Sequence, residues 1–216
     1  MPYPGYFNKI KNSDIFILYD TAQFVKARWD NRNRIRLKDG FTYITIPLEH
    51  KSSFKKRFID IKLPKDTKWR KKHKIMLQRS YGRAEYFKDY FPLIEEIYNS
   101  EIDNLVDFNF SIIKFLIEKL EIKTKILRSS QMGLPSSLSS SKFLSEATKM
   151  AGGNYYLSGP SGGDYMDVKD FNKEKIVVKY QKYECSEYSQ NFAGYVSNLS
   201  TVDLLFNQGP NSSKYI

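Results

Sequence analysis

Short apolar runs and helix-spaced apolar positions alternate along this chain, and they predict its elements one after another. Residues 15–19 are a continuous apolar run ending at Asp20, which is typical of a strand covered on both faces of a parallel sheet. A short helix at residues 5–11 is expected just before it. Residues 33–37 and 41–46 are strand-like and are joined by an Asp-Gly turn, which predicts a β-hairpin.

The middle of the chain has helical spacing, and alternating strands and helices follow it. Helices are expected from Thr67 to Tyr81, from about Arg83 to Ser100, and from Asp103 to Leu120. Strands are then predicted at 125–127, 155–157 and 175–180, and helices at 142–150 and 200–206. This order indicates an α/β chain with a Rossmann-like, mainly parallel sheet, a β-hairpin and a mainly helical insert.

Length and cysteine usage limit the class of protein. A chain of 216 residues suits one domain, 1–216, with the helical insert around residues 51–120. No apolar run reaches about eighteen residues and no basic start precedes an apolar core, so neither a transmembrane segment nor a signal peptide is expected. Cys185 is the single cysteine, and a partly buried thiol is favoured over a nucleophile. A lone thiol suggests a reducing compartment, and we expect a cytoplasmic location.

The chain is strongly basic. Its net charge is +11, from 35 Lys and Arg against 24 Asp and Glu, and this excess attracts anions of any kind. Candidate anionic partners are nucleic acid, nucleotides, sugar phosphates and anionic lipid surfaces. Aromatic residues make up 15% of the chain, which supplies either stacking surfaces or ordinary core packing.

The first candidate site is the basic segment KWRKKHKIMLQRSYGR, residues 68–83. On a helix Arg70 and His73 share a face, and Trp69 lies next to His73 because the two are four positions apart. Such a segment can hold phosphates through Arg70 and Arg79 and use the imidazole for proton transfer. The alternative is a solvated basic helix with a packed histidine, and charge alone favours it.

A second candidate is ARWDNRNRI, residues 27–35. In a strand, Arg32 and Arg34 point to one face, where two guanidinium groups can meet an anionic ligand. An exposed basic edge strand that resists aggregation explains the pattern equally well.

A third candidate is the loop YLSGPSGGDYMD, residues 156–167, where Ser158 and Gly159 directly follow a predicted strand. Ligands of open α/β sheets bind at the carboxyl ends of strands, and glycines permit close approach of phosphate oxygens. The loop has neither the Walker pattern nor a dinucleotide fingerprint, and a plain glycine loop is the alternative.

The fourth candidate is Asp203, which lies among the apolar residues 202–206 of the last predicted helix. A carboxylate in such a place either has a partner in the core or faces a site. The sequence leaves both interpretations open.

Four long segments occur in a distinctive order along the chain. They are GYFNKIKNSDIFILYDTAQFVKARWDNRNRIRLKDG, WRKKHKIML, YLSGPSGGDYMD and LSTVDLLFNQGPNS. Together they resemble the WbqC-like proteins of bacterial and archaeal surface-polysaccharide gene clusters, over nearly the whole chain. The resemblance implies a role in building O-antigen-type glycans, with acyl or aminoacyl transfer to an amino sugar among the implied reactions.

Members of that family usually begin with a short strand and a His-Gln-Pro motif. This chain opens MPYPGYF, which resembles the later part of the family pattern, so the resemblance raises a misplaced start or an amino-terminally truncated, inactive homologue as one interpretation. The strand and histidine motif are similar to the start of nucleotidylyltransferase-like folds, where a histidine loop binds the triphosphate. By that analogy the loop 158–163 would face the missing histidine.

The resemblance, taken with these candidate residues, implies a transferase-type step on a nucleotide-linked or lipid-linked sugar. Phosphates would be held by Arg32, Arg34, Arg70 and Arg79, loop contacts would come from Ser158 and Gly159, and the catalytic candidates are His73 and Asp203. A nucleotide or nucleotide-activated substrate is the expected ligand, and no metal site is predicted. The rival is a noncatalytic nucleic-acid-binding protein, which is less favoured because the basic residues are spread along the chain instead of gathered on one recognition element.

Overall fold

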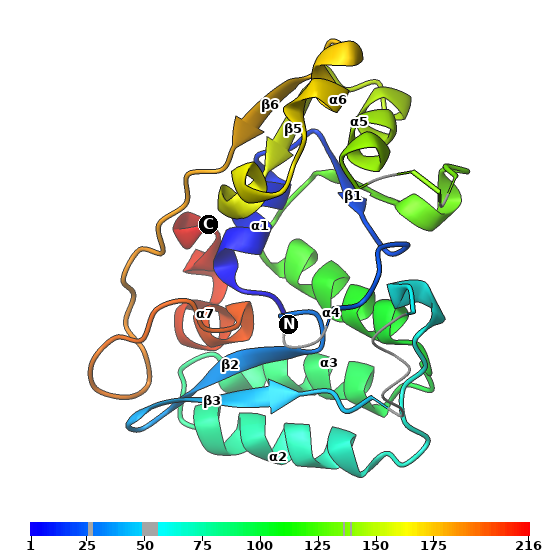
Figure 1. The fold of residues 1–216 in the computed structure, drawn as a ribbon. Helices are drawn as coiled ribbons and strands as arrows, with labels where there is room; N and C mark the ends of the chain where they lie inside the picture. Colours follow the sequence, from blue (N-terminus) through cyan, green and yellow to red (C-terminus); the bar gives the residue numbers. More distant parts are fainter. Residues whose placement is uncertain (26–27, 49–55, 136, 139) are drawn as a thin grey trace. The chain divides into compact units, whose positions relative to one another are not determined.

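A computed structural model describes residues 1–25, 28–48, 56–135, 137–138 and 140–216 (Figure 1). In this described part the protein is mixed α/β, with seven helices and three two-stranded sheets. The chain divides into two compact units. The first holds residues 1–7, 23–123 and 185–216, and the second holds residues 8–22 and 124–184. Residues 51–55, with which the expected helical insert begins, lie outside the described part.

The first unit contains the predicted β-hairpin. Strands β2 (Arg32–Leu37) and β3 (Gly40–Thr45) pair antiparallel, with Arg34 opposite Tyr43. Gly40 has a φ of +116°, which glycine adopts without the steric cost that a side chain would bring. The hairpin predicted from the Asp-Gly turn is confirmed.

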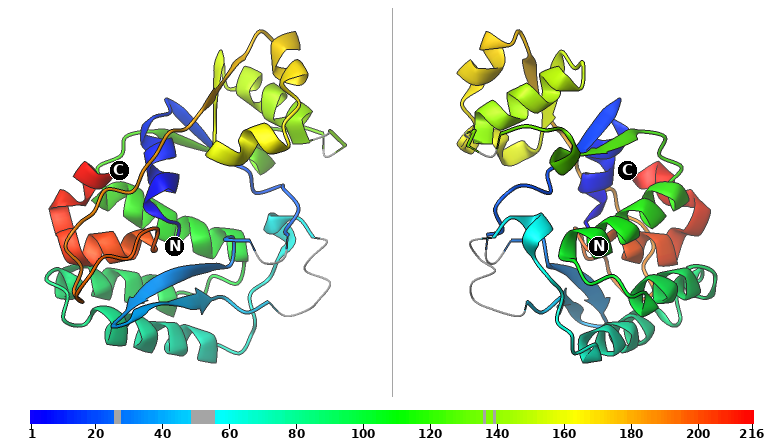
Figure 2. Two further views of the ribbon diagram at one scale, coloured as in Figure 1. Left: turned by 60° about the vertical axis from the view of Figure 1, so that its left-hand side comes forward. Right: turned by 90° about the vertical axis from the view of Figure 1, so that its right-hand side faces the viewer.

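Four helices belong to the same unit. They are α2 (Lys68–Tyr81), α3 (Phe87–Asn99), α4 (Leu105–Lys119) and α7 (Thr201–Gln208). α2 contacts β2, and Figures 1 and 2 both show it running along one face of the hairpin. Asn104 caps the start of α4, where its side chain accepts hydrogen bonds from the backbone N–H groups of Val106 (2.8 Å) and Asp107 (3.4 Å). The helices expected in this region are therefore present.

Apolar side chains of the hairpin and helices form the core of the first unit. Ile35 of the hairpin and Leu77 of α2 are fully buried, as is Phe206 of α7. The Phe206 ring lies 5.2 Å from that of Tyr81 and 5.0 Å from that of Phe87. Burial of each such side chain contributes about 1.5–3 kcal/mol to the free energy of folding. These contacts therefore hold the carboxyl-terminal segment against α2 and α3.

The second unit contains two pairs of parallel strands. β1 (Ile15–Leu18) pairs with β4 (Lys125–Arg128), and β5 (Tyr155–Ser158) pairs with β6 (Val177–Tyr180). The helices of this unit are α5 (Ser140–Met150) and α6 (Val168–Lys173), whereas α1 (Pro4–Lys11) begins in the first unit and ends in the second. α6 connects β5 to β6, and its Phe171 packs with Met166 and Ile176 in a small core.

The mixed α/β class and the parallel pairing are confirmed, whereas a single Rossmann-like sheet is not. The described strands form three separate pairs, β1–β4, β2–β3 and β5–β6. Each strand of the two parallel pairs has only four residues. A local apolar pattern identifies such a strand, but it carries no information about which edges join, because strand pairing depends on residues far apart in the chain.

Candidate functional site

Two arginines and three aromatic rings share one face of the hairpin. Arg32 and Arg34 lie two residues apart in β2, so their side chains leave the same side of the strand. The Arg32 guanidinium lies 4.9 Å from the ring centre of Tyr43, and the Arg34 guanidinium lies 4.8 Å from that of Phe41. The ring of Trp29 lies 6.0 Å from the first guanidinium and 5.6 Å from the second. These five residues are named the Arg–aromatic face.

The rings of the Arg–aromatic face are open to solvent. Their exposed fractions are 57% for Trp29, 41% for Phe41 and 43% for Tyr43. The carbonyl of Asn198 accepts a hydrogen bond from Nη2 of Arg34 at 3.1 Å, and no carboxylate in the described part of the chain pairs with that guanidinium. The rings therefore orient both arginines, and the guanidinium of Arg34 keeps positive charge that an anion can meet.

His73 lies on the buried side of α2 and is not part of the Arg–aromatic face. Its Nε2 lies 2.9 Å from the carbonyl oxygen of Thr45, and its Nδ1 lies 3.2 Å from the hydroxyl of Tyr98. A carbonyl only accepts, so Nε2 carries the proton and Nδ1 accepts from the tyrosine. Burial lowers the pKa of His73 to about 4, which keeps the ring neutral at pH 7.

The neutral state of His73 can be measured directly. The chain has two histidines, so the variant His50→Gln leaves one imidazole signal in an NMR titration. We expect that signal to report a neutral imidazole down to about pH 5, because protonation of the ring would place a cation in the core. A titration centred near pH 6.5, the usual value for a solvated histidine, would contradict the buried position.

Arg70 is also on the buried side of α2. Its Nη1 donates to the carbonyls of Tyr98 (3.0 Å) and Ser100 (2.9 Å), and its Nη2 donates to that of Ile102. These carbonyls lie at and just beyond the end of α3, where a helix leaves acceptors without partners. The geometry thus gives Arg70 a capping role, and burial lowers the pKa of a guanidinium that stays charged.

Asp203 lies in a buried polar cluster in α7. Its Oδ1 accepts hydrogen bonds from the hydroxyl of Tyr188 (2.8 Å) and from Nε2 of Gln190 (3.1 Å). Burial raises the pKa of Asp203 to about 6, although hydrogen bonds from Tyr188, Tyr81 and Gln190 limit the rise. The sequence left open whether Asp203 has a partner in the core or faces a site. Its hydrogen bonds to Tyr188 and Gln190 support a partner in the core.

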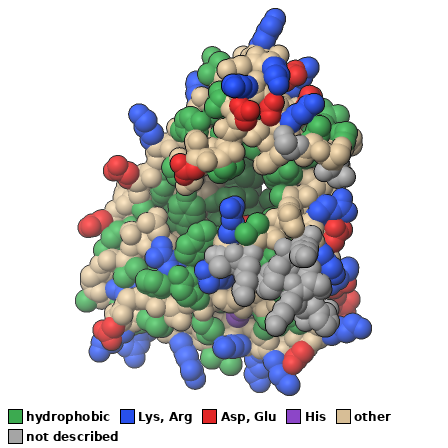
Figure 3. Space-filling view, in the orientation of Figure 1, with side chains coloured by type: hydrophobic (Ala, Val, Ile, Leu, Met, Phe, Trp, Pro, Cys, Tyr) green, Lys and Arg blue, Asp and Glu red, His purple; other side chains and the backbone are tan. Residues whose placement is uncertain are grey.

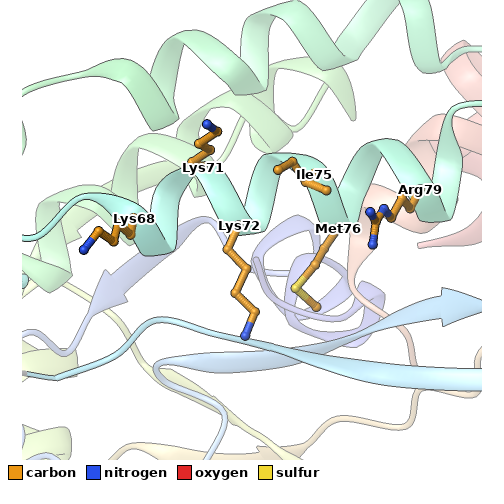
Figure 4. A pocket seen from close by; sticks show the side chains of 6 residues that line it. All are labelled: Lys68, Lys71, Lys72, Ile75, Met76 and Arg79. Atoms are coloured by element: carbon orange, nitrogen blue, oxygen red, sulfur yellow. The ribbon is translucent and has the colours of Figure 1, made fainter.

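Arg79 lies on the solvent side of α2, apart from Arg70 and His73. It lines a shallow pocket together with three lysines of the same helix, Lys68, Lys71 and Lys72 (Figure 4). The basic segment 68–83 is thus divided by its helical period into a buried half and a basic outer half.

Ser158 and Gly159 lie in the second unit, at the end of β5. Ser158 is 1% exposed, and its Oγ lies 3.9 Å from the sulfur of Met166. A Cβ added at Gly162 would come within 1.8 Å of the Ser158 Oγ. Close packing therefore explains one glycine of the loop, and the buried serine hydroxyl does not face solvent.

The sequence analysis missed a polar cluster around Asp20 in the second unit. The carboxylate accepts hydrogen bonds from Nε of Arg128 (2.7 Å) and from the hydroxyls of Ser129 (2.8 Å) and Ser130 (2.7 Å). Burial alone would raise the pKa of Asp20, but the bonds from Ser130, Arg128 and Ser129 bring it below its usual range. The sequence did contain a signal for this cluster. Asp20 follows one predicted strand and the two serines follow another, and the carboxyl ends of paired parallel strands lie side by side.

Other features limit the chemistry of the described residues. Among them no group of three or more His, Cys, Asp and Glu side chains is arranged to hold a metal ion. Within the same ranges no helix combines the length and the apolar character needed to cross a bilayer. Cys185 is partly buried, as predicted, with its Sγ 3.0 Å from the hydroxyl oxygen of Tyr195.

Comparison with known proteins places the chain in a family. The model of the WbqC-like protein family matches residues 1–215. The uncharacterized protein Rv1507c of Mycobacterium tuberculosis is 31% identical over 218 residues, which cover 100% of this chain and 93% of that protein. No solved structure matches the chain.

Proposed function

The chain belongs to the WbqC-like protein family, and from that premise we propose that it carries out a transferase-type step on a nucleotide-linked or lipid-linked sugar. The Arg–aromatic face is the proposed substrate site. The observation that carries the proposal is the placement of two guanidinium groups among three exposed rings on one side of a hairpin. Surface-polysaccharide biosynthesis, with acyl or aminoacyl transfer to an amino sugar, is the setting that the family resemblance supports.

Guanidinium groups on this face suit a phosphate or diphosphate group. A guanidinium presents paired N–H donors that match two phosphate oxygens at once, and Arg32 and Arg34 project from one side of the strand. The rings of Tyr43 and Phe41 already orient these side chains, so less side-chain freedom is lost when the ligand binds. Two neighbouring arginines therefore favour a diphosphate over a neutral sugar.

The exposed rings suit the rest of such a ligand. A nucleotide base stacked on an aromatic ring gains about 1–3 kcal/mol, and Trp29 offers the largest exposed ring of the face. The apolar side of a sugar ring packs on tyrosine in the same way. A nucleoside diphosphate sugar uses both the arginines and the rings, which is why we favour it over inorganic phosphate.

The other predicted residues have supporting parts in this proposal. His73 is bonded to the carbonyl of Thr45 in β3 and acts as a positioning residue beneath the hairpin, whereas Arg70 caps carbonyls at the end of α3. Asp203 belongs to a buried hydrogen-bonded cluster of the same unit, and Arg79 is a candidate for a separate phosphate contact. Ser158 and Gly159 stay candidate loop contacts of the second unit, and the cytoplasm is the proposed location.

Ligand binding tests the proposal. Isothermal titration with UDP-N-acetylglucosamine, geranylgeranyl diphosphate and pyrophosphate separates the nucleotide-linked from the lipid-linked substrate class. We expect Arg34→Ala to weaken binding of the preferred ligand by tenfold or more, because a hydrogen bond to a charged group contributes about 1.5–3 kcal/mol. Trp29→Ala should weaken the nucleotide ligand and leave pyrophosphate unchanged.

Arg83→Ala is the matched control, because Arg83 is also an exposed arginine of the first unit. It should bind like the wild type. Equal affinities for wild type and Arg34→Ala would refute the proposed site. Tighter binding of a random-sequence oligonucleotide, lost steeply with added salt, would instead support the nucleic-acid-binding alternative.

A further inference from the structure

The solvent side of α2 carries a narrow stripe of basic and aliphatic residues. At 3.6 residues per turn, its members fall within about 100° of arc, on the side of the helix opposite Trp69, His73 and Leu77. The members are Lys68, Lys71, Lys72, Ile75 and Arg79. This set is named the α2 stripe, and from its first to its last residue it extends for roughly 17 Å along the helix.

The described part of the protein offers the α2 stripe almost no neutralising charge. α2 contains no acidic residue. Lys71, Lys72 and Arg79 take part in no hydrogen bond or ion pair within the described part of the chain, and Lys68 lies 3.5 Å from Asp66 in an exposed pair that contributes little. Figure 3 shows Lys and Arg side chains in blue along the lower edge of the molecule, where Figure 1 draws α2.

An aliphatic patch interrupts the charges of the α2 stripe. Ile75 is 38% exposed, and Met76 beside it is half-buried. Figure 4 shows Lys68 and Arg79 at the two ends of the helix, with the four other side chains between them. Positive charges on both sides of exposed aliphatic area suit a partner that is anionic at its surface and apolar a few ångströms below it.

We propose that the α2 stripe docks the protein on an anionic lipid surface. The lysines and Arg79 would pair with headgroup phosphates while Ile75 and Met76 enter the boundary of the acyl chains, with the helix axis parallel to the membrane. The stripe holds no aromatic ring on which an unpaired base could stack, which favours a membrane over single-stranded nucleic acid. This inference goes beyond the proposed function and stands whether or not the Arg–aromatic face binds a sugar diphosphate.

Vesicle co-sedimentation tests the docking surface. The full chain is mixed with vesicles of phosphatidylcholine alone and with vesicles of phosphatidylcholine plus phosphatidylglycerol. We expect binding to the anionic vesicles only. The double variant Lys71→Gln/Lys72→Gln should bind them about thirtyfold more weakly, since each removed charge costs about fivefold. Ile75→Ser should reduce binding about fivefold without changing the net charge, because it removes the aliphatic contact.

The control is Lys169→Gln/Lys182→Gln, which removes the same charge from exposed positions outside α2. It should bind anionic vesicles nearly as tightly as the wild type. An equal loss in both double variants would show general attraction by net charge and overturn the inference, as would equal binding to neutral vesicles. Binding of a random-sequence oligonucleotide that only the α2 variant loses, without lipid binding, would assign the stripe to nucleic acid. Titration of the same α2 variant with UDP-N-acetylglucosamine keeps this outcome separate from that of the proposed function.

Discussion

Replacing Arg36 by methionine is expected to lower the free energy of unfolding by about 3–5 kcal/mol. Arg36 is only 2% exposed, and its guanidinium donates to the carbonyls of Leu37 (2.6 Å), Gly40 (3.0 Å) and Ala193 (2.7 Å). Methionine fills much of the same volume but donates nothing, so these carbonyls would lose their partner. The hairpin turn and the segment that covers it would loosen together.

Arg34→Met is the matched control, because it makes the same change two residues away in β2. Arg34 is partly exposed, and we expect its replacement to change stability by less than about 1 kcal/mol. Urea unfolding followed by tryptophan fluorescence suits the comparison, since both tryptophans, Trp29 and Trp69, belong to the first unit. Similar losses in the two variants would show that Arg36 does not anchor the covering segment.

The three arginines of β2 show what periodicity can and cannot predict. Strand alternation correctly gives Arg32 and Arg34 one face, and Arg36 follows the same period. Arg36 is nevertheless buried, because Ala193 and its neighbours cover it from a position 157 residues further along the chain. No local pattern contains that contact, so the division of one basic strand into an exposed and a buried part follows only from the tertiary structure.

The basic helix α2 shows the same limit for the candidate site. The basic charge of this segment suggested a site at Arg70, His73 and Arg79. Apolar or aromatic residues at positions 69, 73 and 77, however, recur every four residues, which is the pattern of a buried face. That pattern was available in the sequence. What could not be seen there is that Thr45 and Tyr98 satisfy the imidazole, because these partners come from the hairpin and from α3.

The elements themselves were largely predictable, and their assembly was not. The apolar run at residues 15–19 and the Asp-Gly turn before Phe41 gave a strand and a hairpin at the correct places. The partner of β1 is β4, more than a hundred residues away, and this pairing brings Asp20 to Arg128. Short-range spacing contains no information on such a pair, so the polar cluster around Asp20 was missed.

The variant Asp203→Asn is expected to gain about 2 kcal/mol of stability relative to the wild type as the pH rises from about 4 to about 6. Burial raises the pKa of Asp203 from 3.8 to about 6, so over this range the folded wild type holds a proton that the unfolded chain has already released. Stability contributed by the neutral carboxyl is thus present at low pH and lost as the pH rises. The asparagine does not titrate, and its oxygen can still accept from Tyr188.

His73 has the opposite effect on the pH dependence of stability. The quantity to measure is therefore the difference in unfolding free energy between the variant and the wild type at each pH. The pKa of His73 falls from 6.5 to about 4 on folding, so the unfolded chain binds a proton first and stability rises with pH over nearly the same range. In the wild type the two residues oppose each other, and its profile alone reveals neither. Subtracting the wild-type profile from that of Asp203→Asn removes the histidine and leaves the contribution of the carboxyl.

Urea unfolding of both proteins at a series of pH values from 3.5 to 7 provides this difference profile. The control is Asp164→Asn, which makes the same change at an exposed carboxyl. A flat profile for Asp203→Asn would mean that Tyr188 and Gln190 stabilise the charged carboxylate as well as water does. Asp203 would then ionise at the same low pH in the folded and the unfolded chain, and the interpretation of its cluster as a core that favours the protonated acid would be wrong.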